Sequence, residues 1–170
     1  SSSGLHTNFK ISSNLETISL SDSSGEIIDQ LTIENLPPDT SLGVNANNID
    51  LVVFSETTPG YQNSNNYYTG AVNESVIFSN NGGFLNGSIS LSLSGNSSGQ
   101  VIRYTTDATN PNETSLIYSS PIQISENAII RAKIFQTNHI PSITLSKSYI
   151  FDNVPEIDTV FLTTDPANLF

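Results

Sequence analysis

The stretch Ser88-Ile89-Ser90-Leu91-Ser92-Leu93-Ser94 alternates serine with large apolar residues over seven positions. Successive side chains of a β-strand point to opposite faces, so Ile89, Leu91 and Leu93 share one face and the serines share the other. The following residues, Gly95-Asn96-Ser97-Ser98-Gly99, are turn formers. The stretch therefore predicts a half-buried strand that ends in a tight turn.

The same alternation, interrupted by Gly, Pro, Asn and Ser, recurs across residues 73–152. Further strands are predicted at 101–106, 115–118, 121–124, 127–135 and 142–151. Their apolar positions are Ile102, Tyr104, Ala128, Ile130, Ala132, Ile134, Ile143, Leu145 and Tyr149. About seven short strands in about 80 residues predict an all-β fold, an immunoglobulin-like or fibronectin-like β-sandwich.

A smaller, partial β module is predicted over residues 1–60. Strands are expected at 16–20, 26–33 and 49–54, with a hairpin turn at 21–25. Residues 61–72 are rich in Asn and lack apolar periodicity, which predicts a linker. Residues 153–170, with a strand expected at 157–162, are predicted to start a further domain.

Charge and composition narrow the possible partners. The net charge is −11 and the chain has five basic residues, which argues against nucleic acid and against an anionic membrane surface. There is no long apolar run, so no membrane insertion is expected. The chain lacks cysteine and begins with Ser1 instead of methionine. We expect a piece of a longer protein whose partners are its flanking domains.

Two basic residues, Arg131 and Lys133, lie two positions apart and so share a face if they lie on a strand. The favoured interpretation is a solvated face, because most exposed cations serve no site. The alternative interpretation is a site for an acidic ligand.

No motif for catalysis is found. His6 and His139 are the only histidines, and neither has a local Ser, Cys or Asp motif beside it. There is no phosphate-binding glycine loop and no Gly-x-Ser-x-Gly sequence. Most acidic residues fall in turns or linkers, so we do not expect a hydrolase, or any enzyme.

One loop carries four oxygen-bearing side chains, Asp107, Asn110, Asn112 and Glu113, that could bind calcium. Their spacing is not that of an EF-hand. The favoured interpretation is a turn whose Asp and Asn side chains cap the loop's own backbone. No other cofactor is expected.

Polysaccharide binding commonly uses exposed aromatic rings, and the chain has no Trp. The candidates are Tyr61, Tyr67 and Tyr68 in the predicted linker. By contrast, Tyr104, Tyr118 and Tyr149 occupy strand positions that favour the core or half-buried surroundings.

The second module resembles the chitobiase/β-hexosaminidase C-terminal domain family. The resemblance is carried by Ile102-Arg103-Tyr104-Thr105-Thr106-Asp107, Pro111, Ser115, Tyr118, Pro121-Ile122, Ile124, Ile130-Arg131-Ala132-Lys133, Pro141-Ser142 and Tyr149. Ala108 departs from it, because family members usually carry Gly there. The resemblance implies a non-catalytic β-sandwich attached to secreted bacterial enzymes and surface proteins.

The flanks carry two further resemblances. Residues 4–11 and 17–22, with Leu36-Pro37-Pro38-Asp39 and Thr58-Pro59-Gly60, resemble the second half of a bacterial lamin-tail domain. Residues 160–170 resemble the start of a spore-coat protein H-like kinase domain, without its catalytic residues. Together they imply structural spacer modules of a secreted or cell-surface protein. The alternatives are a carbohydrate-binding accessory module and an adhesion or protein-interaction module, with or without calcium.

Overall fold

The computed structural model describes residues 10–12, 15–33, 35–45, 50–151, 160 and 162–168. These residues form strands and loops with a single 3-10 turn, η1 (Pro166–Asn168), which confirms the predicted all-β fold. The chain divides into two compact units, residues 1–69 and 70–170. In the described residues there is no helix with the length and apolar character that crossing a membrane requires.

The first unit contains a hairpin of β1 (Glu16–Ser21) and β2 (Ile27–Ile33), which confirms the two strands predicted there. The turn is stabilised by Asp22, whose Oδ1 accepts hydrogen bonds from the backbone N–H groups of Ser24 and Glu26, both at 2.9 Å. Gly25 follows with a φ of 90°, a value that L side chains rarely adopt. Local side-chain chemistry thus explains why the chain reverses here.

Burial in the first unit is concentrated on the second hairpin, β3 (Ser41–Val44) and β4 (Leu51–Phe54). Val52, Val53 and Phe54 are buried, whereas much of the β1–β2 hairpin is exposed. Val53 and Tyr68 exchange two backbone hydrogen bonds, of 2.9 and 2.8 Å. The segment predicted as a linker therefore forms part of this unit's hydrogen-bonded structure.

The second unit is built on a five-stranded sheet, in the order β11-β10-β13-β15-β7. The strands are β7 (Gly83–Phe84), β10 (Gln100–Thr105), β11 (Leu116–Ile117), β13 (Ala128–Gln136) and β15 (Leu145–Ile150). β13 is the longest strand and pairs antiparallel with both β10 and β15. The predicted inward positions Ile130, Ala132 and Ile134 are 0% exposed, so the alternation in this strand is confirmed.

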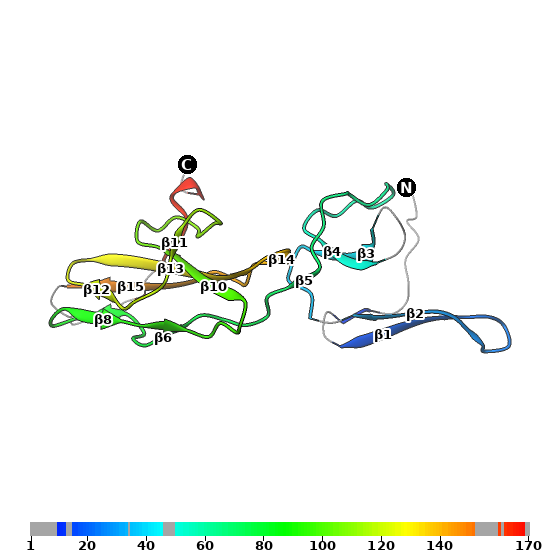
Figure 1. Cartoon of the computed structure of the whole chain (residues 1–170), viewed down its shortest axis with the longest axis horizontal. Coiled ribbons are helices and arrows are strands. Elements are labelled where there is room, and N and C mark those ends of the chain that lie inside the picture. The colour runs from blue at the N-terminus through cyan, green and yellow to red at the C-terminus, as the bar shows by residue number, and fades with distance from the viewer. Residues whose placement is uncertain are drawn as a thin grey trace. The chain divides into compact units, whose positions relative to one another are not determined.

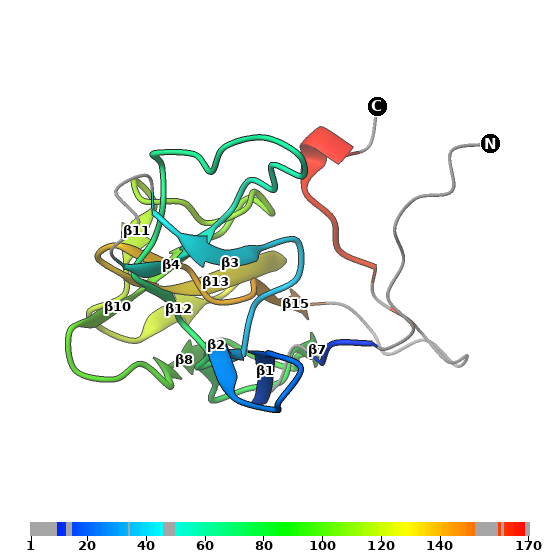
Figure 2. The same ribbon diagram turned by 90° about the vertical axis from the view of Figure 1, so that its right-hand side faces the viewer.

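A second layer packs on this sheet, as both views of the ribbon show with β13 above β8 (Figures 1 and 2). It consists of β6 (Ile77–Phe78), β8 (Ile89–Leu91), β9 (Leu93–Ser94) and β12 (Ile122–Ile124), paired as β12–β8 and β6–β9. The remaining pair, β5 (Gly70–Ala71) with β14 (His139–Ile140), is parallel.

The prediction of one continuous strand over 88–94 is wrong at Ser92. The backbone N–H of Ser92 donates to the Ser79 hydroxyl at 2.9 Å, and its carbonyl accepts from the Ser79 N–H at 2.9 Å. A side-chain acceptor here replaces a ladder bond, so the strand is split into β8 and β9. The inward direction of Leu91 and Leu93 is confirmed, because both are buried.

Other differences concern strand ends and short strands. Ile143, predicted among the apolar strand positions, is 58% exposed, because Ser142 bonds to Ile134 and β15 begins only at Leu145. The sequence analysis did not predict the short strands β3, β5, β6, β7 and β14. Strands of two to four residues are too short to show an alternating pattern. The strand predicted at 157–162 lies mostly outside the described residues.

The two layers enclose one apolar core, which contains Tyr149 at 0% exposure. Its hydroxyl donates a 2.9 Å hydrogen bond to the carbonyl of Asn80, 69 residues earlier in the chain. Burial raises the pKa of Tyr149 to about 12, because the ionised phenolate loses its hydration inside the core. The core-side predictions for Tyr104, Tyr118 and Tyr149 are confirmed.

The raised pKa of Tyr149 gives stability a dependence on alkaline pH. In the unfolded chain the phenol ionises near pH 10, while the folded one stays neutral until about pH 12. Stability is therefore fully present below pH 10 and is lost as the pH rises toward 12, by roughly 2–3 kcal/mol from this residue. Urea unfolding of wild type and Tyr149→Phe between pH 8 and 12 measures this loss.

We expect Tyr149→Phe to be less stable than wild type by about 1 kcal/mol at pH 8, since the Asn80 carbonyl loses its partner. Between pH 8 and 12, Tyr149→Phe should lose less unfolding free energy than wild type does. Tyr61→Phe is the matched control, because Tyr61 is 85% exposed and should leave the profile unchanged. If the free energy of unfolding falls equally with pH in wild type and Tyr149→Phe, the buried phenol is not the source of the alkaline loss of stability.

Candidate functional site

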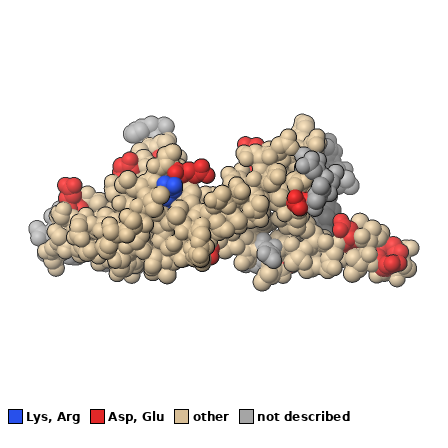
Figure 3. Space-filling model, in the orientation of Figure 1, with Lys and Arg blue, Asp and Glu red and all other residues tan. Residues whose placement is uncertain are grey.

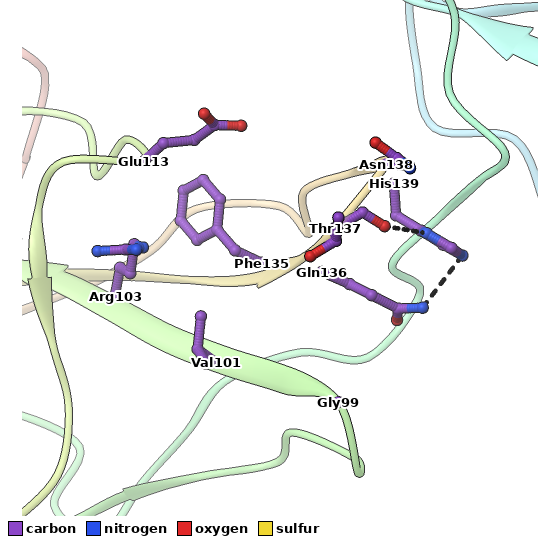
Figure 4. A pocket seen from close by; sticks show the side chains of 9 residues that line it. All are labelled: Gly99, Val101, Arg103, Glu113, Phe135, Gln136, Thr137, Asn138 and His139. Carbon is purple, nitrogen blue, oxygen red and sulfur yellow. Dashed lines mark hydrogen bonds between the residues drawn. The ribbon is translucent and has the colours of Figure 1, made fainter.

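A hollow of about 450 Å³ lies on the outer face of the five-stranded sheet, beside β10, β13 and the turn that follows β13. Figure 4 shows the side chains that line it. They are Gly99, Val101, Arg103, Glu113, Phe135, Gln136, Thr137, Asn138 and His139. Sequence reasoning missed most of this set, although Val101, Arg103 and Phe135 alternate with core residues on two predicted strands.

The aromatic ring in this hollow is covered. Phe135 is 8% exposed, and the Arg103 guanidinium carbon lies 6.0 Å from the centre of its ring. Arg103 is held there because its Nη1 donates a 2.7 Å hydrogen bond to the carbonyl of Ser115. A sugar stacks on an open ring face, so this hollow offers no such platform.

His139, at the other end of the hollow, is held by two hydrogen bonds (Figure 4). Nδ1 lies 2.9 Å from the Thr137 carbonyl, which only accepts, and Nε2 lies 3.2 Å from the Gln136 amide nitrogen, which only donates. These partners correspond to a neutral ring protonated on Nδ1. The bonds brace the turn between β13 and β14. His6 lies outside the described residues.

The loop predicted as a possible calcium site uses its oxygens on its own backbone. Asp107 Oδ1 accepts from the Thr109 N–H at 3.1 Å and from its hydroxyl at 2.6 Å. Asn112 Oδ1 accepts from the Thr114 N–H at 2.9 Å and from its hydroxyl at 2.7 Å. The Thr109 hydrogen bonds hold the pKa of Asp107 below its usual value. This is the capping pattern of the favoured interpretation.

The other two predicted ligands point to different neighbours. Asn110 Oδ1 accepts from the Thr144 hydroxyl at 3.3 Å, and Glu113 lines the hollow. Among the described residues no three His, Cys, Asp or Glu side chains gather as a metal site would require. Oxygens already engaged in this way fit a self-capped loop better than a calcium loop. Calcium binding stays a prediction.

Ala108, which departs from the resemblance described above, has a φ of 65°. This is the left-handed region, where a Cβ is unfavourable and glycine is favoured. The turn is kept despite the alanine, and the Ala108 carbonyl accepts a 2.8 Å hydrogen bond from Arg131. A glycine would be favoured at this position for a backbone reason.

The three candidate tyrosines of the first unit lie in different surroundings. Tyr61 is 85% exposed, Tyr67 is 41% exposed and contacts Phe54 edge-on with ring centres 6.5 Å apart, and Tyr68 is half-buried. The two that are neighbours in sequence are thus anchored to the unit. Only Tyr61 presents most of its ring to solvent, and carbohydrate binding by this set stays a prediction.

Arg131 and Lys133 do share a face, the outer face of β13, but the solvated-face interpretation is wrong for Arg131. Its residue exposure is only 9%, and Lys133 is half-buried. The 106–115 loop and the 162–168 segment contact Arg131 through the Ala108 carbonyl and the Asp165 carboxylate. No strand pattern contains that information, because the covering segments come from elsewhere in the chain.

Comparison with known proteins gives a match to one protein-family model over part of the second unit. Searches of curated proteins and of solved structures found no match. The lamin-tail and kinase resemblances of the flanks stay predictions. Residues 80–146, which include most of the five-stranded sheet and the self-capped loop, match the model of the chitobiase/beta-hexosaminidase C-terminal domain family, a non-catalytic domain.

Proposed function

We propose that residues 70–151 are a rigid, non-catalytic spacer between flanking domains of a secreted or cell-surface protein. The observation that carries the proposal is where the chain enters and leaves this part of the fold. Gly70 and Ala71 pair with His139 and Ile140, just beyond the end of β13. Phe151 donates its N–H to the Asn127 side chain, just before the start of β13.

The longest strand therefore separates the two ends. β13 has nine residues, which at about 3.3 Å each span roughly 26–30 Å. The strand is paired on both sides and its core-facing Ile130, Ala132 and Ile134 are 0% exposed, so it cannot bend freely. A module with this geometry keeps whatever precedes residue 70 apart from whatever follows residue 151.

The match to a non-catalytic domain family supports the proposal. The burial of the aromatic rings also supports it, because none of the described Phe and Tyr side chains in residues 70–168 is exposed. Carbohydrate-binding modules normally need such rings at the surface.

Spin labels at the two ends of β13 test the rigidity. The full chain contains no cysteine, so Glu126→Cys and Thr137→Cys, both at exposed positions, give two specific attachment points. We expect one narrow distance distribution centred at about 30–40 Å, since eleven residue steps of extended chain separate the sites. Each single-cysteine variant is the control and should give no intramolecular distance.

A broad or multiple distribution would show a flexible connector and contradict the proposal. Depletion of the full chain from solution by insoluble chitin, cellulose or xylan would also contradict the spacer proposal, because a spacer needs no polysaccharide ligand. If such binding is lost in Tyr61→Ala, the carbohydrate-binding alternative takes the place of the spacer.

A further inference from the structure

A row of cations lies on the outer face of the five-stranded sheet. Arg103 on β10 is paired with Lys133 on β13, and Arg131 lies two residues from Lys133 on the same face. These are three of the five basic residues in a chain of net charge −11. In Figure 3, basic atoms (blue) are visible at one place on the second unit, next to acidic atoms (red). Three of the five cations of this chain thus share one face of the sheet.

The Arg131 guanidinium is buried without full hydrogen bonding. Its Nη1 donates to the Ala108 carbonyl at 2.8 Å, while its Nε has no hydrogen-bond partner. A buried charged donor that lacks an acceptor costs free energy, and a bound anion removes that cost.

Lys133 adds a second charge that is not neutralised. Burial lowers its pKa, and the neighbouring Arg131 charge lowers it further. The one ion pair found among the described residues belongs to Arg131, so no described acidic side chain lies within ion-pair distance of Lys133. Two adjacent, partly desolvated cations, of which only Arg131 has a carboxylate within ion-pair distance among the described residues, favour an anionic ligand.

One carboxylate already reaches this place. Asp165 Oδ2 accepts a 2.8 Å hydrogen bond from the Asn110 N–H and lies 3.9 Å from Arg131 Nη1. Its Oδ1 accepts from the Ala167 N–H at 3.0 Å. The Thr163 hydroxyl, two residues earlier, lies 3.2 Å from the Ser148 hydroxyl. The segment 163–167 thus returns to the sheet and presents its carboxylate to the cations.

We propose that Arg131 and the Asn110 N–H, with Lys133 beside Arg131 on the same strand face, form a carboxylate-binding site for an acidic peptide segment, which Asp165 fills from within the same chain. A peptide is the class of ligand that the geometry favours, because the carboxylate now present is aimed by a peptide turn. Its second oxygen is bonded to the backbone two residues later. Backbone hydrogen bonds to Asp165, from Ala167 and Asn110, lower its pKa and keep it ionised.

This inference goes beyond the spacer function, since it gives the module a surface that a second acidic segment can occupy. A ligand in the same chain competes at an effective concentration of about millimolar, so it masks the site from weaker ligands. Removing the charge of Asp165 should unmask it.

The test uses the full chain and a fluorescent peptide with the sequence of residues 160–168, followed by anisotropy. We expect Asp165→Asn to bind this peptide at least about ten-fold more tightly than wild type does. The same peptide with Asn in place of its aspartate should not bind. Asp22→Asn is the matched control, because Asp22 also accepts backbone hydrogen bonds in a turn but lies far from these cations in sequence. It should behave as wild type.

Arg131 is too buried for its replacement to be a clean test, so Lys133→Gln in the Asp165→Asn background serves instead. It should weaken peptide binding several-fold while the circular dichroism spectrum stays unchanged. Failure of Asp165→Asn to bind the peptide, or equal binding of the aspartate and asparagine peptides, would overturn the proposal. Binding of glucuronate without binding of the peptide would overturn the choice of a peptide ligand.

Discussion

Replacing Leu91 by alanine is expected to lower the free energy of unfolding of the second unit by about 3–4 kcal/mol. Leu91 is 0% exposed and comes from β8 in the second layer, facing the fully buried side chains of β13. Truncation removes apolar contact and leaves a cavity between two layers that cannot close, because both are fixed by strand pairing. Small domains have only about 5–15 kcal/mol of stability, so the loss is a large fraction.

Urea unfolding followed by circular dichroism measures this loss. Ile77→Ala is the control, because Ile77 lies on β6 in the same layer but is 61% exposed. It should cost less than about 1 kcal/mol. Equal losses for the two variants would mean that the core does not lie between the two layers.

Gly95→Ala is expected to cost about 3–4 kcal/mol, from two causes that act together. The φ of Gly95 is 108°, which is unfavourable for any residue with a Cβ. A Cβ at this position would also lie 2.3 Å from the Ser75 carbonyl oxygen, which is backbone and cannot rotate away. The β6–β9 pair next to it would have to move apart.

Gly99→Ala separates the two causes. Gly99 has a φ of 82°, but no atom lies within 4 Å of the Cβ that alanine would add, so only the backbone cost of about 1 kcal/mol applies. The difference between the two variants, measured by urea unfolding, is the cost of the contact with Ser75. Losses of the same size would show that the backbone at residue 75 gives way.

Strand existence and side-chain direction were predictable because they depend on local alternation. In β13 each second residue is apolar, and this alone places Ile130, Ala132 and Ile134 in the core. The Asp22 turn was predictable for a similar reason, since its hydrogen bonds join residues no more than four apart. The self-capping of Asp107 and Asn112 is equally local.

The candidate site was only partly predictable. Sequence reasoning paired Arg131 with Lys133 and kept an acidic ligand as an alternative, but it placed both in solvent. Burial of Arg131 depends on the Ala108 carbonyl, 23 residues away, and on Asp165, 34 residues away. Long-range contacts of this kind leave no periodic signal in a single sequence.

By itself, the sequence determined that this is an all-β protein, which residues of its longest strands point inward, and where its self-capped turns lie, because these properties arise from neighbours within a few residues. Only the tertiary structure decided that Ser92 divides a strand, that the Tyr67–Tyr68 segment is anchored, and that a carboxylate meets the buried guanidinium. Each of these depends on a partner distant in the chain: the Ser79 hydroxyl, the β4 backbone and Asp165. Such partners are brought together by the packing of layers, after local preferences have already been satisfied.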